Sequence, residues 1–206
     1  MQNFAKKLLA SVTLAGAATG ATASTVTAVD TGHNFSYAIM GDLWGDWTNV
    51  NLATFDNFAM ANPISSWATG QSAFGNYMGE LPQNTRWESH VGDLALFSTF
   101  TFADANAVTA LTLDVASDNG FAIFLNDQLL AKDNQEYYTT YWEYTFSVPT
   151  SYLLTGSNTL KVLAEDHGGK SFFDMRLTAD IPAPGAAALI GLSGLLIRRR
   201  SMKGSR

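Results

Sequence analysis

The 206-residue chain contains no cysteine, which excludes disulfide bonds, thiolate metal ligands and a thiol nucleophile together. Proline is also scarce, with five residues, and only 15% of the chain is charged. The length suits one domain with accessory segments, because domains commonly contain about 100–200 residues. Without cross-links, such a domain must be stabilised by the packing of its hydrophobic residues, which make up 47% of the chain.

Basic residues are almost absent from the middle of the chain. Seven of the 12 lysines and arginines lie in the first seven or the last nine residues, whereas all 18 acidic residues lie between Asp30 and Asp180. The middle therefore has five basic and 18 acidic residues, a net charge of −13. Because so acidic a stretch repels phosphate backbones and anionic lipids, the sequence predicts a protein that does not bind nucleic acid.

The N-terminus, residues 1–23, has the three parts of a secretory signal peptide. Lys6 and Lys7 form a basic start, residues 8–18 are largely apolar, and Ala21 and Ala23 form a small-x-small cleavage site. We expect export through the Sec machinery and cleavage after Ala23. An amphipathic helix is the alternative, but it would need a polar stripe that the apolar run does not supply.

A short apolar run lies between prolines and arginines in residues 181–206. Pro182 and Pro184 stop any strand or helix before it, because proline has no amide donor. As a helix, residues 186–197 would be about 18 Å long, against a bilayer core of about 30 Å. Three arginines follow, namely Arg198, Arg199 and Arg200. Since such a cluster stays cytoplasmic, the tail predicts a short hydrophobic helix that tethers the acidic domain outside the inner membrane.

This tail resembles a PEP-CTERM sorting signal, which occurs in Gram-negative bacteria that make extracellular polysaccharide. The resemblance is carried by Pro182-Ala183-Pro184, the apolar run and the arginine cluster, and Ala183 stands where the motif has glutamate. It implies processing by an exosortase-like enzyme, followed by release to the cell surface or the extracellular matrix. A plain membrane anchor that is retained is the alternative.

Residues 24–180 contain many strand-like segments. Apolar and polar residues alternate toward the end of Leu96–Phe102 and throughout Leu111–Val115, as in strands with one buried face. Phe121–Leu125 is almost entirely apolar, as in a strand covered on both faces, and Asn126-Asp127 supplies a turn. Further strand-like runs are Leu129–Ala131, Tyr141–Val148, Thr159–Ala164 and Phe172–Leu177. Short strands at this spacing predict an all-β antiparallel sandwich.

Residues 41–87 carry weaker signals. They are rich in asparagine, glycine and tryptophan, and we expect loops with a few edge strands. Leu52, Phe55, Phe58 and Ala59 are spaced as in one short helix.

Three segments, Ala116–Asp127, Trp142–Pro149 and Leu154–Leu160, resemble the galactose-binding-like jelly roll appended to secreted glycosidases and surface proteins. The shared features are an Asp/Asn-Gly turn, an aromatic-rich strand, a tight hairpin and a tryptophan-containing strand. The resemblance covers residues 92–180 and implies the jelly-roll form of the sandwich. It bears on fold more than on function, because one sandwich supports many unrelated activities.

The sequence contains little that resembles a catalytic motif. His33, His90 and His167 occur singly, without the spacing of a zinc site. Paired carboxylates could hydrolyse glycosides, but among 18 acidic residues some pairing arises by chance. We therefore predict that the chain is not an enzyme, with a glycoside hydrolase as the least favoured reading.

Calcium is the one cofactor that the sequence suggests, as a structural ion. The candidate ligands are Asp118, Asn119, Asp166 and Asp174. Calcium takes six to eight oxygen ligands, and the neighbouring glycines permit a tight loop, although no EF-hand spacing occurs. The favoured alternative is that Asp118 and Asn119 cap a turn and that Asp166 begins a polar loop.

Aromatic and polar residues alternate around residues 133–142, as a glycan site requires. A sugar lays its C–H face on an aromatic ring while its hydroxyls meet polar groups. The candidates are Asp133, Asn134, Tyr137, Tyr138, Tyr141 and Trp142. In a strand, Trp142 would favour core packing over ligand contact, whereas the loop position of Tyr137 and Tyr138 favours exposure. A second set consists of Trp44, Trp47 and Trp87.

These patterns together predict an exported envelope or matrix protein whose sandwich binds extracellular polysaccharide without catalysis. The alternative is a structural surface protein with no discrete ligand, whose acidity supports solubility and calcium-mediated association.

Overall fold

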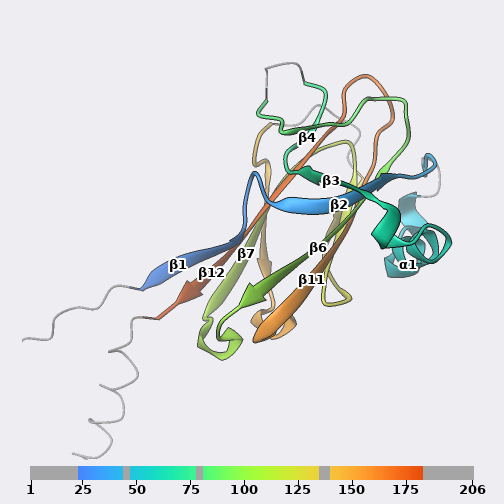
Figure 1. The fold of residues 1–206 in the computed structure, drawn as a ribbon. Coiled ribbons are helices and arrows are strands. Elements are labelled where there is room, and N and C mark those ends of the chain that lie inside the picture. Colours follow the sequence, from blue (N-terminus) through green and yellow to red (C-terminus); the bar gives the residue numbers. More distant parts are fainter. Residues whose placement is uncertain (1–22, 44–46, 78–80, 135–139, 183–206) are drawn as a thin grey trace, which may run out of the picture. The chain divides into compact units, whose positions relative to one another are not determined.

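The computed structural model describes residues 23–43, 47–77, 81–134 and 140–182. Within these ranges the chain forms two six-stranded sheets, one α-helix and four 3-10 turns, all in the unit Ala23–Pro182 (Figure 1). The predicted signal peptide up to Thr22 and the predicted tail from Ala183 onward lie outside the described residues.

The first sheet has the strand order β10-β7-β12-β4-β5, with β1 also paired to β12. Its strands are β1 (Ser24–Val29), β4 (Phe74–Gly75), β5 (Thr85–Arg86), β7 (Ala110–Asp118), β10 (Tyr144–Val148) and β12 (Phe172–Ile181). All pairs are antiparallel except β4 with β5. One edge of β12 is shared, since β4 pairs with its first residues and β1 with its last ones.

The second sheet has the strand order β3-β2-β6-β11-β8-β9. Its strands are β2 (Asn34–Ile39), β3 (Ala68–Gln71), β6 (Leu94–Phe102), β8 (Phe121–Leu125), β9 (Gln128–Asp133) and β11 (Gly156–Ala164). A two-residue turn joins β8 to β9, and its residues Asn126 and Asp127 have φ values of 49° and 65°. Because a type I′ hairpin needs positive φ at both positions, Asn-Asp suits this turn.

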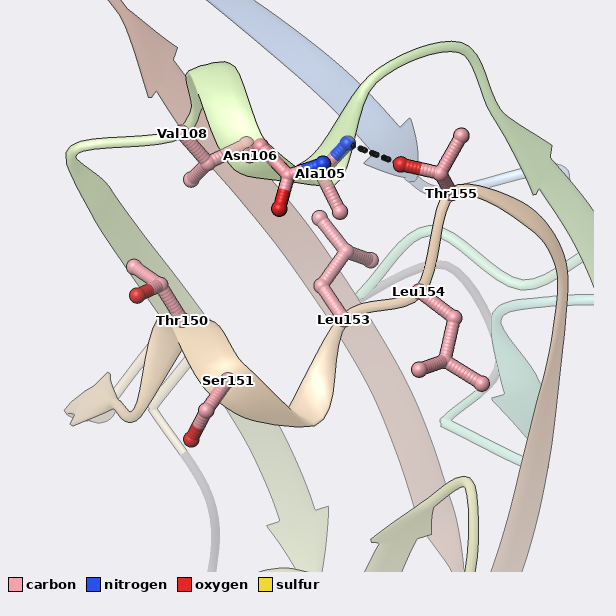
Figure 2. Close-up of a pocket in the computed structure, with 8 residues that line it drawn as sticks. All are labelled: Ala105, Asn106, Val108, Thr150, Ser151, Leu153, Leu154 and Thr155. Carbon is pink, nitrogen blue, oxygen red and sulfur yellow. Dashed lines mark hydrogen bonds between the residues drawn. The ribbon is translucent and has the colours of Figure 1, made fainter.

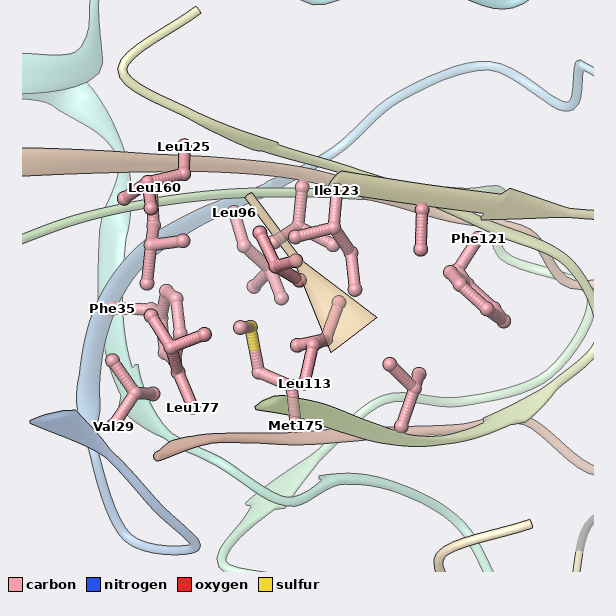
Figure 3. Packing of buried hydrophobic residues seen from close by; sticks show 14 of the residues in the cluster. Val29, Phe35, Leu96, Leu113, Phe121, Ile123, Leu125, Leu160, Met175 and Leu177 are labelled. Atoms are coloured by element: carbon pink, nitrogen blue, oxygen red, sulfur yellow. The ribbon is translucent and has the colours of Figure 1, made fainter. Parts of the chain in front are cut away.

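The main core lies between the two sheets, where alternate residues of each strand interdigitate (Figure 3). In β7, for example, Leu113 and Val115 point into the core, whereas Asp114 lies on the outer face. Burying an aliphatic side chain of this size stabilises a fold by about 1.5–3 kcal/mol. The period-two pattern of the sequence thus decides which face of each strand joins the core.

The α-helix α1 (Leu52–Ala61) packs on the outer face of the second sheet, which explains why β8 is buried on both sides. Ile123 of β8 points into the main core, while Phe124 packs with Phe55 in the cluster under the helix. The four 3-10 turns are η1 (Trp47–Asn49), η2 (Ile64–Ser66), η3 (Ala105–Ala107) and η4 (Thr150–Tyr152).

The two-sheet all-β fold predicted from the sequence is confirmed, as are the strands of its second half and the short helix. The strand predicted over Tyr141–Val148 begins instead at Tyr144. Trp142 lies in the turn before it with φ of 60°, a left-handed conformation that a strand does not contain, so its placement in a strand was wrong. No helix in the described part of the chain is long and apolar enough to cross a membrane.

Candidate functional site

A pocket of about 260 Å³ lies where β9 ends, and it brings an indole ring together with several polar groups. Its lining residues, which define the Trp47 pocket, are Trp47, Thr48, Lys132, Asp133 and Asn134. Two of the six predicted glycan-binding residues, Asp133 and Asn134, are therefore in one pocket with a tryptophan of the second predicted set.

Three hydrogen bonds attach η1 to the end of β9 and so build the pocket. The indole Nε1 of Trp47 donates to the carbonyl oxygen of Asp133 at 2.8 Å. The ammonium group of Lys132 donates to the carbonyl oxygens of Thr48 at 3.0 Å and Val50 at 2.6 Å. Burial lowers the pKa of Lys132, and the nearby Glu165 carboxylate opposes that shift. Because Trp47 is only 4% exposed, it forms an apolar wall rather than an open platform.

The remaining predicted glycan residues do not join this pocket. Tyr137 and Tyr138 lie outside the described residues, as does Trp44. Trp87 is 1% exposed and its indole donates to the carbonyl of Gly92 at 3.1 Å, which makes it a core residue.

Tyr141 and Trp142 lie together on the outer face of the first sheet. Their rings stack with centroids 4.5 Å apart, and the guanidinium carbon of Arg176 lies 4.9 Å from the Trp142 ring centroid. The hydroxyl of Tyr141 donates to Asp174 at 3.0 Å, and that of Thr31 donates to the same oxygen at 2.6 Å. Burial is the main cause that raises the pKa of Tyr141 to about 12. Contacts within the protein thus occupy much of this aromatic pair.

The four candidate calcium ligands accept hydrogen bonds from neighbouring loops. Asp118 accepts from the Tyr77 hydroxyl, and Asn119 accepts from the amide of His167 at 2.8 Å. Asp166 accepts from the amides of His90 at 2.7 Å and Gly168 at 2.9 Å. Asp174 accepts from the hydroxyls of Tyr141 and Thr31. Over the described ranges, no group of three or more histidine, aspartate or glutamate residues is arranged to hold a metal ion. Calcium binding stays a prediction.

The same end of the sandwich holds an aspartate that sequence reasoning missed. Asp93 is fully buried just before β6, and its carboxylate accepts from the amides of Leu43 at 2.8 Å and Asp166 at 3.0 Å. Burial raises the pKa of Asp93 to about 7 and that of Asp118 to about 6. The sequence signal that could have revealed it is an acidic residue placed directly before a buried apolar strand.

No protein-family model matches the chain, and no curated protein matches it. Among solved structures, it is similar to an α-L-rhamnosidase of Streptomyces avermitilis complexed with L-rhamnose, with 21% identity, a TM-score of 0.35, and coverage of 41% of this chain and 8% of that one. It is similar to a Bifidobacterium dentium β-glucuronidase, with 14% identity, a TM-score of 0.49, and coverage of 78% and 30%.

A third similar structure is a PA14 sugar-binding domain from an RTX adhesin, with 17% identity, a TM-score of 0.41, and coverage of 73% of this chain and 91% of that one. The chain spans less than a third of the length of the two glycosidases. The chain's own residues define a two-sheet β protein with a small, indole-walled polar pocket.

Proposed function

We propose that the chain is an exported, non-catalytic carbohydrate-binding protein, and that the Trp47 pocket holds one sugar unit. The observation that carries the proposal is the convergence of an indole wall with hydroxyl, ammonium, carboxylate and amide groups around about 260 Å³. Sugars need this combination, because their C–H faces are apolar and their hydroxyls must be hydrogen-bonded.

The size of the pocket restricts the ligand. Pockets for drug-sized molecules measure roughly 300–1,000 Å³, so this one accommodates a single small unit. That favours a terminal or branching sugar over the middle of a stiff polysaccharide chain. A hexose has about 12 non-hydrogen atoms, and about −0.3 kcal/mol per atom gives a dissociation constant on the order of 1 mM.

The polar groups provide both senses of hydrogen bonding. Lys132 has three N–H donors, of which the carbonyls of Thr48 and Val50 take two, and the third is available to a sugar hydroxyl. The Asp133 carboxylate accepts hydrogen bonds, and the Asn134 amide both donates and accepts them. A hydroxyl group can therefore act as donor to one side of the pocket and as acceptor to the other.

Monosaccharide titration of the purified full chain tests this function. The probes are D-galactose, D-glucosamine and D-glucuronate, and binding is detected by ligand-observed NMR. We expect saturable binding of at least one, weakened about fivefold in Asn134→Ala, because one hydrogen bond contributes about 1 kcal/mol. The matched control is Asn57→Ala on the exposed face of α1. Absence of saturable binding, or equal affinities in the two variants, would overturn the proposal.

The export part of the proposal is supported by the two chain ends. A signal peptide and a tail of the PEP-CTERM type would carry the sandwich across the inner membrane, tether it there and release it where polysaccharide accumulates. Mass spectrometry of the protein from its native host tests this part. We expect a mature start at Ser24 and an end near Pro184, whereas an intact Arg206 in the membrane fraction would contradict processing.

A further inference from the structure

A second pocket, of about 460 Å³, lies at the opposite end of the sandwich between the turns η3 and η4 (Figure 2). Its lining residues, which define the η3–η4 pocket, are Ala105, Asn106, Val108, Thr150, Ser151, Leu153, Leu154 and Thr155. None of them belongs to the Trp47 pocket. The volume lies within the range of small-molecule sites, roughly 300–1,000 Å³.

Part of the pocket lining belongs to the main core, and hydrogen bonds hold η3 in place beside it. Val108 and Leu153 are buried members of the main core, and Figure 2 shows the Leu153 side chain between the two turns. On one side, the carboxylate of Asp104 accepts from the amide of Asn106 at 3.0 Å and caps η3. The hydroxyl of Thr155 accepts from the amide of Ala105 at 2.8 Å, which ties η3 to the start of β11.

The lining of this pocket is uncharged, which stands out in a stretch with a net charge of −13. Within the described ranges, the side chains of Asn106, Thr150 and Ser151 make no hydrogen bond to the protein. Leu154 is 50% exposed beside them. The pocket therefore presents amide and hydroxyl groups next to aliphatic surface.

We infer that the η3–η4 pocket is a second ligand site and that it takes an uncharged sugar unit of the 6-deoxyhexose class. A carboxylate would lose hydration here without gaining a cationic partner, and it would lie near the Asp104 carboxylate that caps η3, so acidic sugars are disfavoured. The ring hydroxyls can bond to Asn106 and Thr150, while the methyl group of a 6-deoxyhexose covers Leu153 and Leu154. An ordinary hexose places a hydroxyl on that apolar surface instead.

The two pockets are far enough apart to act independently. The residue after Thr155 begins β11, and the last residue of β11, Ala164, pairs with Phe121, which in turn pairs with Asp133. Eight residue steps along β11 at about 3.3 Å each separate the two ends by about 26 Å. A small change in one pocket is therefore not expected to alter binding in the other.

A matched pair of sugars tests the inference, because L-fucose differs from L-galactose only in lacking the 6-hydroxyl group. The full chain is titrated with each sugar and binding is measured from chemical-shift changes. We expect L-fucose to bind about tenfold more tightly than L-galactose. Asn106→Ala and the isosteric Thr150→Val are each expected to weaken L-fucose binding about fivefold. Asn57→Ala on the exposed face of α1 is the control and is expected to leave L-fucose affinity unchanged, and Asn134→Ala identifies any L-fucose that binds in the Trp47 pocket instead.

The outcomes separate this inference from the proposed function. If Asn134→Ala alone removes L-fucose binding, or if Asn106→Ala and Thr150→Val bind as the unmodified chain does, the second site is wrong while the Trp47 pocket stands. If D-glucuronate competes with L-fucose for the η3–η4 pocket, or L-galactose binds equally well, the assigned sugar class is wrong. If Asn106→Ala removes all sugar binding, the second site stands and the Trp47 pocket falls. Thermal unfolding of each variant verifies that it is folded.

Discussion

The indole nitrogen of Trp47 and the carbonyl oxygen of Asp133 are joined by a 2.8 Å hydrogen bond, although the two residues are 86 positions apart. The bond attaches η1 to the end of β9, next to Asn134 in the Trp47 pocket. The same contact therefore supports both the local fold and the shape of the proposed sugar site.

Replacing Trp47 by phenylalanine tests both roles at once. We expect Trp47→Phe to lower the free energy of unfolding by about 1–3 kcal/mol, because the Asp133 carbonyl loses its donor. Sugar binding at the pocket should fall as well. Trp67→Phe is the matched control, since Trp67 is also buried and its indole donates to the carbonyl of Asn62 at 2.7 Å, away from the pocket. Urea unfolding and sugar titration of both variants test this, and equal binding losses would contradict it.

Stability is expected to fall as pH rises from about 4 to about 7. Burial raises the pKa of Asp93 from 3.8 to about 7, so the folded state retains a proton that the unfolded state has already lost in this range. The stabilisation is complete below the unfolded pKa and disappears as pH passes the folded one. Three pKa units correspond to a few kcal/mol.

Urea unfolding between pH 4 and pH 8 measures this effect. Asp93→Asn should show a flatter pH dependence than the unmodified chain, because it has no proton to lose. Asn57→Ala, at an exposed position of α1, should keep the original dependence because it changes no titratable group. A flat profile in the unmodified chain would rule out the raised pKa of Asp93.

Two adjacent glycines allow a test of close packing near His90. Gly168 and Gly169 have φ values of 93° and 84°, so alanine is strained at either position. At Gly168 a Cβ atom would also overlap the His90 ring, whereas at Gly169 it would meet nothing within 4 Å. We expect Gly169→Ala to cost about 1 kcal/mol and Gly168→Ala clearly more. Urea unfolding compares the two variants. Equal losses in the free energy of unfolding would contradict the prediction, because they would show that the His90 ring moves aside.

The core between the sheets should respond to truncation at Ile123, which is fully buried in β8. We expect Ile123→Ala to lower the free energy of unfolding by about 2–5 kcal/mol, through lost burial and the cavity that remains. The control is Leu129→Ala in β9, where the side chain is 49% exposed and the loss should stay below about 0.5 kcal/mol. A loss at Ile123 no larger than at Leu129 would contradict the assigned core.

Local patterns predicted much of the second half of the fold. The alternation in Leu111–Val115 and the apolar run Phe121–Leu125 correspond to β7 and β8, and Asn126-Asp127 forms the expected turn. By contrast, β1 and β2 were not predicted, since their sequences carry fewer large apolar residues. Such signals depend on residues two to four positions apart, which the chain displays directly.

The sites could be predicted only in part. Asp133 and Asn134 were selected for their polarity beside aromatic residues, and they do lie in a pocket with an aromatic wall. The aromatic partner is Trp47, however, and Trp142 lies in a separate cluster with Arg176. A hydrogen bond from the side chain of Trp47 in η1 to the backbone at the end of β9 joins Trp47 to Asp133 across 86 positions, and no local pattern contains that information.

By itself, the sequence determined the acidic middle, the two distinctive chain ends and the period-two strands of a β-sandwich, because each depends on composition or on near neighbours. The tertiary structure decided which polar groups became buried and which residues share a pocket. Asp93 is buried, and the η3–η4 pocket exists, only because loops from distant segments meet at the two ends of the sheets. Those meetings depend on strand order and register, which long-range packing selects.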